Sequence, residues 1–205
     1  MLRILAAAVL AFLIISASAA AEDVTAFGDS YTAGSGSWFK VLDLGGRNFA
    51  VSGAVCNPAF TTVSGKRLSS QIARWRAAGR PTNDWVVVFM GINDIEEATS
   101  TFGPSRTAYV AALKALRGAG AKLILVVTAP NLGKVPRYAG TSRAATMTSK
   151  TRTWNGFVRR QATAFSAGLV DLFNKLPSAD LYTSDGLHPN AKGQAIIAKA
   201  IGAKL

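Results

Sequence analysis

A serine near the start of the chain and an aspartate and a histidine near its end have the residue types that acyl transfer requires. Ser30 follows Gly28-Asp29, and His188 stands three residues after Asp185. His188 is the only histidine among 205 residues, so no other imidazole can act as a general base. A serine hydroxyl attacks a carbonyl well only when a base takes its proton, and an aspartate can hold that base in the correct tautomer. We therefore predict Ser30 as nucleophile, His188 as base and Asp185 as the residue that orients the base.

The tetrahedral intermediate of such a reaction carries an oxyanion, for which the sequence offers three hydrogen-bond donors. They are the backbone N–H groups of Ser30 and Gly53 and the side-chain amide of Asn93. A glycine permits close approach of the main chain because it has no Cβ. Taken singly, each residue also fits an ordinary role as a turn, a helix cap or a strand end. Their combination with a single histidine favours the catalytic interpretation. We expect Asp29 and Asp94 to hold loops through backbone hydrogen bonds rather than to perform chemistry.

Strands that end just before these residues are needed to position them. Apolar runs predict strands over residues 23–27, 47–51, 85–90, 122–128 and 168–172. Helices are predicted over residues 69–78, 105–117, 142–166 and 190–202, and the aromatic stripe of the third is assigned to the core. This alternation indicates an α/β fold with a parallel sheet covered on both faces. Ser30, Gly53 and Asn93 follow the first three strands, at the carboxyl edge where such sheets form their sites.

The first 21 residues have the features of a signal peptide. Arg3 precedes an apolar run over residues 4–15, which suits a secretory leader and is short for a membrane span. Small residues with A-x-A spacing follow at residues 16–21. We predict a leader over residues 1–21, a single domain over residues 22–205 and no transmembrane segment after cleavage. The protein is then exported to the periplasm or the extracellular space of a bacterium.

The formal net charge of +12 falls only to about +11 when Arg3 leaves with the leader. The basic residues are scattered and form no nucleic-acid motif, so we expect no nucleic-acid partner, while peripheral attraction to anionic surfaces stays open. One histidine and one cysteine cannot build a usual zinc site, and no cofactor motif is present, so we expect neither metal nor cofactor. Cys56 is expected to be a small buried residue rather than a reactive thiol.

Four short blocks resemble those of the GDSL (SGNH) hydrolase family, in its order and over nearly the whole chain after the leader. They are Gly28-Asp29-Ser30-Tyr31, residues 48–54 with Gly53, Gly91-Ile92-Asn93-Asp94, and Asp185-Gly186-Leu187-His188-Pro189. The resemblance implies a three-layer α/β/α sandwich with a flavodoxin-like central parallel sheet of about five strands. It also implies ester or thioester hydrolysis by Ser30, Asp185 and His188, with an oxyanion hole of Ser30, Gly53 and Asn93.

Tyr31 departs from the leucine that usually follows the nucleophile in this family, and we expect it to reshape the pocket floor. Residues 129–136 loosely resemble the loop after the fourth strand in lipase-like members of the family. The leading hypothesis is a secreted esterase or lipase that cleaves small-molecule, lipid or glycan esters through an acyl-enzyme. Alternatives are a carbohydrate O-acetylesterase or thioesterase of the same family and, from another class, a non-catalytic envelope or polysaccharide-binding protein. The sequence leaves the acyl-chain length, the acyl acceptor and the oligomeric state open.

Overall fold

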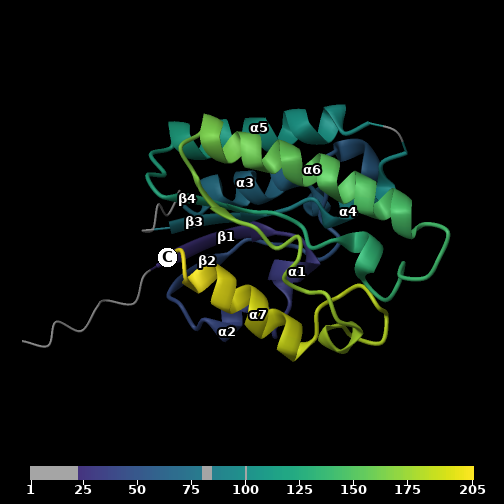
Figure 1. Cartoon of the computed structure of the whole chain (residues 1–205). Coiled ribbons are helices and arrows are strands. Elements are labelled where there is room, and N and C mark those ends of the chain that lie inside the picture. The colour runs from purple at the N-terminus through teal and green to yellow at the C-terminus, as the bar shows by residue number, and fades with distance from the viewer. Residues whose placement is uncertain (1–22, 80–84, 100) are drawn as a thin grey trace, which may run out of the picture.

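A computed structural model describes residues 23–79, 85–99 and 101–205, which form one parallel sheet with helices on both faces (Figure 1). The predicted leader at residues 1–21 lies outside the described residues. The strands are β1 (Val24–Gly28), β2 (Gly46–Asn48), β3 (Trp85–Phe89), β4 (Ile124–Val127) and β5 (Gly168–Val170). Their order is β2-β1-β3-β4-β5 and every pairing is parallel, which is the flavodoxin-like order. The predicted sheet of about five strands is confirmed.

The central strands are apolar runs because helices cover both of their faces. All five residues of β1 are buried, and they pair in register with the five residues of β3. The second strand is shorter than predicted and ends at Asn48. Its continuation still follows β1, since the N–H groups of Phe49 and Val51 donate to the carbonyls of Ala26 and Gly28 at 2.8 and 3.1 Å.

The helices form the two outer layers. Helices α3 (Leu68–Ala77), α5 (Gly103–Gly118) and α6 (Ala144–Ala164) lie on one side of the sheet, and α2 (Trp38–Val41) and α7 (Ala191–Gly202) lie on the other (Figure 1). The four predicted helices are confirmed as α3, α5, α6 and α7, with ends shifted by no more than two residues. Among the residues described, no helix combines the length and apolar character that crossing a bilayer requires.

Two short helices, α1 (Ser30–Ala33) and α4 (Ile92–Glu97), begin where β1 and β3 end. Neither was predicted as a helix. The remaining elements are the 3-10 helices η1 (Pro58–Phe60), η2 (Ser64–Lys66), η3 (Leu132–Lys134) and η4 (Ala179–Leu181). These short elements form most of the carboxyl edge of the sheet, and they carry or flank the candidate site residues.

The aromatic stripe of α6 is part of the core, as predicted. Trp154 is fully buried, and its ring packs at centroid distances of 5.4 to 5.8 Å against Phe102, Tyr109 and Phe157. Its indole N–H donates to the Met90 carbonyl at 3.2 Å, directly after β3. The core therefore fixes the point at which the chain leaves β3 and enters α4.

Candidate active site

The candidate site lies at the carboxyl edge of the sheet, where the strand order changes direction between β1 and β3. Open α/β sheets form a crevice at such a switch point because the connections from the two strands leave toward opposite faces. Ser30 is the first residue of α1, directly after β1, and Asn93 is the second residue of α4, shortly after β3. The topology alone therefore brings these two residues together.

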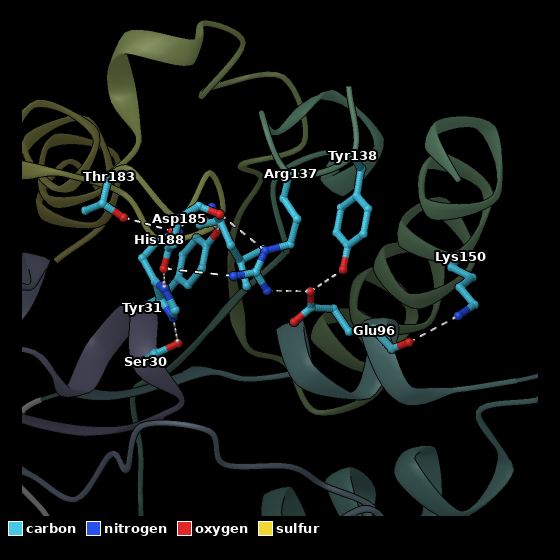
Figure 2. A network of polar contacts seen from close by, with 10 residues as sticks. Ser30, Tyr31, Glu96, Arg137, Tyr138, Lys150, Thr183, Asp185 and His188 are labelled. Atoms are coloured by element: carbon cyan, nitrogen blue, oxygen red, sulfur yellow. Dashed lines mark hydrogen bonds and ion pairs between the residues drawn. The ribbon is translucent and has the colours of Figure 1, made fainter. Parts of the chain in front are cut away.

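Ser30, His188 and Asp185 form one chain of hydrogen bonds (Figure 2). The Nε2 atom of His188 lies 2.9 Å from the Ser30 hydroxyl oxygen, although the two residues are 158 positions apart in the sequence. The Nδ1 atom of His188 contacts Oδ2 of Asp185. One ring nitrogen can therefore accept the serine proton while the other is held by a carboxylate, which is the arrangement of a serine hydrolase triad.

Several hydrogen bonds hold Asp185 in its ionised form. Burial acts to raise its pKa, but hydrogen bonds from the side chain and backbone N–H of His188 and the backbone N–H of Leu187 outweigh this effect. The hydroxyl of Thr183 also donates to Oδ1 of Asp185, at 2.8 Å. Together these donors hold the pKa of Asp185 well below its usual range. The carboxylate is therefore negative at any pH where His188 is to act as a base.

Asp29 and Asp94 hold the loops around the nucleophile, as predicted. The Asp29 carboxylate accepts from the backbone N–H groups of Tyr31 and Ile92 at 3.1 and 3.2 Å, and so joins α1 to α4. Asp94 accepts from the N–H groups of Cys56 and Asn57 at 2.8 and 2.9 Å, and joins α4 to the segment after Gly53. Both carboxylates are fully buried.

Gly53 and Asn93 lie on adjoining segments beside the nucleophile. The Asn93 amide donates to the carbonyl of Ala54, the next residue after Gly53, at 2.8 Å. An amide group has two N–H donors, so one can fix the side chain while the other serves a substrate oxygen. Gly53 has φ +73°, in the left-handed region that favours glycine, and a Cβ there would lie 3.2 Å from Nζ of Lys66.

A cleft of about 470 Å³ opens beside Ser30 and His188. Its walls come from Ser52, the loop over residues 33–37 and the start of α7, and its lining residues are Ser30, Ala33, Gly34, Ser35, Gly36, Ser37, Ser52, His188, Pro189, Asn190, Ala191 and Gln194. Among the residues that the structure describes, no leucine, isoleucine, valine, methionine or phenylalanine lines this cleft. Small side chains, hydroxyl groups and amides therefore line the side of Ser30 and His188 that faces this cleft.

Tyr31 does not form the floor of this cleft, contrary to the expectation from the sequence. Its side chain is fully buried, and its hydroxyl donates to the backbone carbonyl of Leu187 at 2.7 Å. The substitution therefore ties the nucleophile helix α1 to the loop that carries His188. The sequence also did not single out Arg137, whose Nη2 lies 4.0 Å from Oδ2 of Asp185.

Cys56 is buried as predicted, and burial raises the pKa of its thiol well above the usual value. It contributes its backbone N–H to Asp94 and no thiolate to the site. Within residues 23–79, 85–99 and 101–205, no group of three or more histidine, cysteine, aspartate or glutamate side chains is arranged to hold a metal ion.

Three solved structures share this fold at low sequence identity. A member of the lipolytic protein G-D-S-L family from Veillonella parvula has a TM-score of 0.65 at 16% identity, covering 88% of this chain and 96% of that chain. A GDSL-like lipase from Bacteroides thetaiotaomicron has a TM-score of 0.63 at 17% identity, covering 89% and 87%. An acetyl xylan esterase from Geobacillus stearothermophilus has a TM-score of 0.63 at 17% identity, covering 89% and 94%.

A comparison with curated protein sequences found no match. The sequence profile of the GDSL-like Lipase/Acylhydrolase family, in contrast, matches residues 26–196. That range contains Ser30, Gly53, Asn93, Asp185 and His188, whose geometry is described above. The chain therefore belongs to the GDSL-like lipase/acylhydrolase family and is a serine ester hydrolase.

Proposed function

We propose that the protein is exported and hydrolyses carboxylic esters through an acyl-enzyme on Ser30. The observation that supports this most directly is the 2.9 Å contact between the Ser30 hydroxyl and Nε2 of His188. His188 takes the serine proton as the hydroxyl attacks the ester carbonyl, and then gives a proton to the departing alcohol. Water, activated by the same imidazole, releases the acid from Ser30. Asp185 holds the ring and stabilises the imidazolium during each transfer.

We assign the oxyanion hole to the backbone N–H groups of Ser30 and Gly53 and the amide of Asn93. Donors that are fixed before the reaction cost no reorganisation when the oxyanion forms. Asn93 is fixed by Ala54, while Asp29 and Asp94 fasten α4 and the loop after Gly53. These contacts support a preorganised hole and give each buried carboxylate a function that involves no proton transfer.

The lining of the cleft favours a short acyl group on a hydroxylated alcohol over a long alkyl chain. A long chain needs an apolar channel to leave water, whereas serines, an asparagine and a glutamine suit hydroxyl groups. This supports the alternative of a carbohydrate O-acetylesterase more than that of a lipase. The similar structure from Geobacillus stearothermophilus is described as an acetyl xylan esterase, which agrees in substrate class. A thioesterase remains the further alternative within the family.

We infer that attraction to anionic surfaces acts through one face of the sandwich. Helix α3 carries two lysines or arginines, α5 carries three and α6 carries four, and none of these helices contains an aspartate or glutamate. These helices form the same outer layer (Figure 1). Retention of the protein on an acidic polysaccharide resin should fall steeply with salt, and the double variant Arg76→Gln, Lys114→Gln should elute earlier. Elution that is independent of salt would remove this proposal.

The function is tested with p-nitrophenyl esters from acetate to palmitate and with an acetylated polysaccharide, using the mature protein and its Ser30→Ala variant. We expect turnover to fall steeply with acyl length and to vanish in the variant. Preference for palmitate would favour the lipase and overturn the short-acyl assignment. Full activity of Ser30→Ala would overturn the acyl-enzyme, and a protein without ester turnover would direct attention to the thioesterase and the non-catalytic binding protein. Secretion is tested by sequencing the N-terminus of the exported protein.

A further inference from the structure

The guanidinium of Arg137 lies between the triad aspartate and a glutamate on α4 (Figure 2). Its Nη2 is 4.0 Å from Oδ2 of Asp185, the same oxygen that contacts His188. Its Nε donates to the backbone carbonyl of Asp185 at 3.3 Å, and its Nη1 is 3.4 Å from Oε1 of Glu96. One side chain therefore contacts both the carboxylate and the backbone of the residue that orients the base.

The backbone of Arg137 also lies directly against the triad loop. Its N–H donates to the carbonyl of Gly186 at 3.0 Å. Gly186 has φ +70°, and a Cβ there would lie 2.7 Å from the nitrogen of Arg137 and 3.1 Å from Cβ of Pro136. The two segments touch main chain to main chain, so a movement of Arg137 is transmitted to Asp185.

Glu96 is itself held in place at the other end of this contact. Its Oε1 also accepts from the hydroxyl of Tyr138, and its side chain is only 14% exposed. Nζ of Lys150 donates to the carbonyl of Ile95 at 3.1 Å and fastens the end of α4 to α6. Helix α4 also carries Asn93, the amide that we assign to the oxyanion hole. Arg137 thus connects the loop of the base with the helix of the oxyanion donor.

We propose that Arg137 is a positioning residue that fastens the Asp185–His188 loop to Glu96, so that the triad and the oxyanion hole keep one mutual geometry. This inference rests on the proposed catalytic roles of Asp185, His188 and Asn93. Ester hydrolysis needs the base and the oxyanion donors in register around one carbonyl, and a misplacement of about 1 Å can cost up to about 100-fold in rate. The ion pair between Arg137, beside the triad loop, and Glu96, on α4, contributes to that register.

Arg137 and Glu96 carry opposite charges, so substitutions at these two positions are expected to change the electrostatics near Asp185 in opposite directions. Arg137 carries a positive charge beside Asp185, and Glu96 carries a negative charge beside Arg137. Tyr31 interacts electrostatically with Asp185, and also with Asp29 and Tyr182. Tyr138 interacts with Glu96, Arg137 and Arg143, and Lys150 interacts with Glu96 and Arg143. None of these six neighbouring groups changes in the variants below, so a change in titration reports on Arg137 and Glu96.

The experiment compares Arg137→Gln, Glu96→Gln and the exposed control Lys204→Gln with the untagged wild-type protein. His188 is the only histidine, so its imidazole signals in an NMR titration need no assignment and no substrate. We expect Arg137→Gln to raise the titration midpoint by about half a pH unit, the size typical of a partly exposed ion pair, and Glu96→Gln to lower it. The acid limb of kcat/KM should move in the same directions. Both variants should lower kcat about tenfold with little change in KM, and Lys204→Gln should do neither.

Loss of kcat in both variants is the decisive result for positioning. Removal of the two charges alone would move the titration midpoint in opposite directions but would not lower turnover at a pH where the imidazole is neutral. Equal shifts in both variants, or an Arg137→Gln midpoint that matches Lys204→Gln, would overturn the proposal. An unchanged kcat in both variants would do the same. These outcomes are distinct from failure of the proposed function, since the NMR titration is read without ester turnover and Ser30→Ala tests the nucleophile separately.

Discussion

Replacing Tyr31 with phenylalanine removes one buried hydrogen bond between the nucleophile helix and the loop of the base. The hydroxyl donates to the Leu187 carbonyl at 2.7 Å, and burial raises the pKa of Tyr31 well above its usual value, so the group remains a donor. The variant keeps the ring, which packs edge-on against Phe89 at 5.7 Å, and leaves the carbonyl without this donor. Such a loss costs about 1–2 kcal/mol. For a domain of this size we expect the Tm to fall by about 3 to 6 °C.

The same bond should contribute to catalysis, because Leu187 directly precedes His188. We expect kcat for a short-chain ester to fall about tenfold in Tyr31→Phe while KM changes little. Tyr182→Phe is the matched control, since that buried hydroxyl also donates to a backbone carbonyl, that of Leu176 at 3.0 Å, and not to the loop of the base. Thermal unfolding should show a similar loss of stability in both variants, and ester turnover should fall only in the first. A Tm within about 1 °C of wild type for Tyr31→Phe, or an equal loss of kcat in Tyr182→Phe, would refute the reasoning.

Two further predictions concern the residues around the oxyanion. Asn93→Ala should lower kcat by about 100- to 1,000-fold with a smaller effect on KM, because one oxyanion donor is lost. The measurement is steady-state kinetics on a short ester, and values of kcat and KM near those of wild type would contradict the assignment of Asn93 to the oxyanion hole. Burial raises the pKa of Asp29 to about 7, against the opposing hydrogen bonds from Tyr31 and Ile92. A carboxyl whose pKa is raised by folding stabilises the protein fully below its unfolded value of 3.8, and that contribution is lost as the pH rises through about 7. Urea unfolding of the wild-type protein should therefore show a loss of stability between pH 4 and 8 that is absent in Asp29→Asn. If the free energy of unfolding varied with pH in the same way in both proteins, the assignment to Asp29 would be wrong.

The long elements could be predicted from the sequence because their patterns are local. A strand buried on both faces is an uninterrupted apolar run, as in β3 and β4, and a helix on a sheet has one apolar stripe, as in α6. The alternation of these patterns gave the parallel sheet, and the carboxyl edge then followed from the direction of the strands. The order of the strands was implied by the family resemblance and by no local pattern.

The short elements could not be predicted because they are too short to show a periodic pattern of apolar residues. Helices α1, α2 and α4 have four to six residues, fewer than two turns, and their stability comes from contacts rather than from propensity. Helix α1 is capped by the side chain of Asp29, which accepts from the N–H of Tyr31. An aspartate before a serine is common in turns as well, so the helix becomes evident only with the fold.

Contacts between segments that are distant in the sequence could not be predicted either, because no local pattern contains both partners. The hydroxyl of Tyr31 bonds to a residue 156 positions away, and Arg137 contacts a residue 48 positions away. Arg137 looked like one more solvated cation among many, because its sequence neighbours do not reveal that the triad loop lies beside it. Ser30, Asp185 and His188 could be found because their chemistry is specific, and not because their positions could be derived.

The buried carboxylates of Asp29 and Asp94 explain how so much irregular chain keeps a fixed geometry. Where strands end, backbone N–H groups lose their partners in the sheet and must find others. Asp29 accepts one such group from α1 and one from α4, and Asp94 accepts two from the segment after Gly53. Four N–H groups that the sheet cannot satisfy thus become the contacts that align the nucleophile, α4 and the loop after Gly53. Burial raises the pKa of Asp29 because a charge in this place loses its contact with water. The active site is thus held by side chains that replace secondary structure, and the substitutions most damaging to its geometry should lie among residues that never touch the substrate.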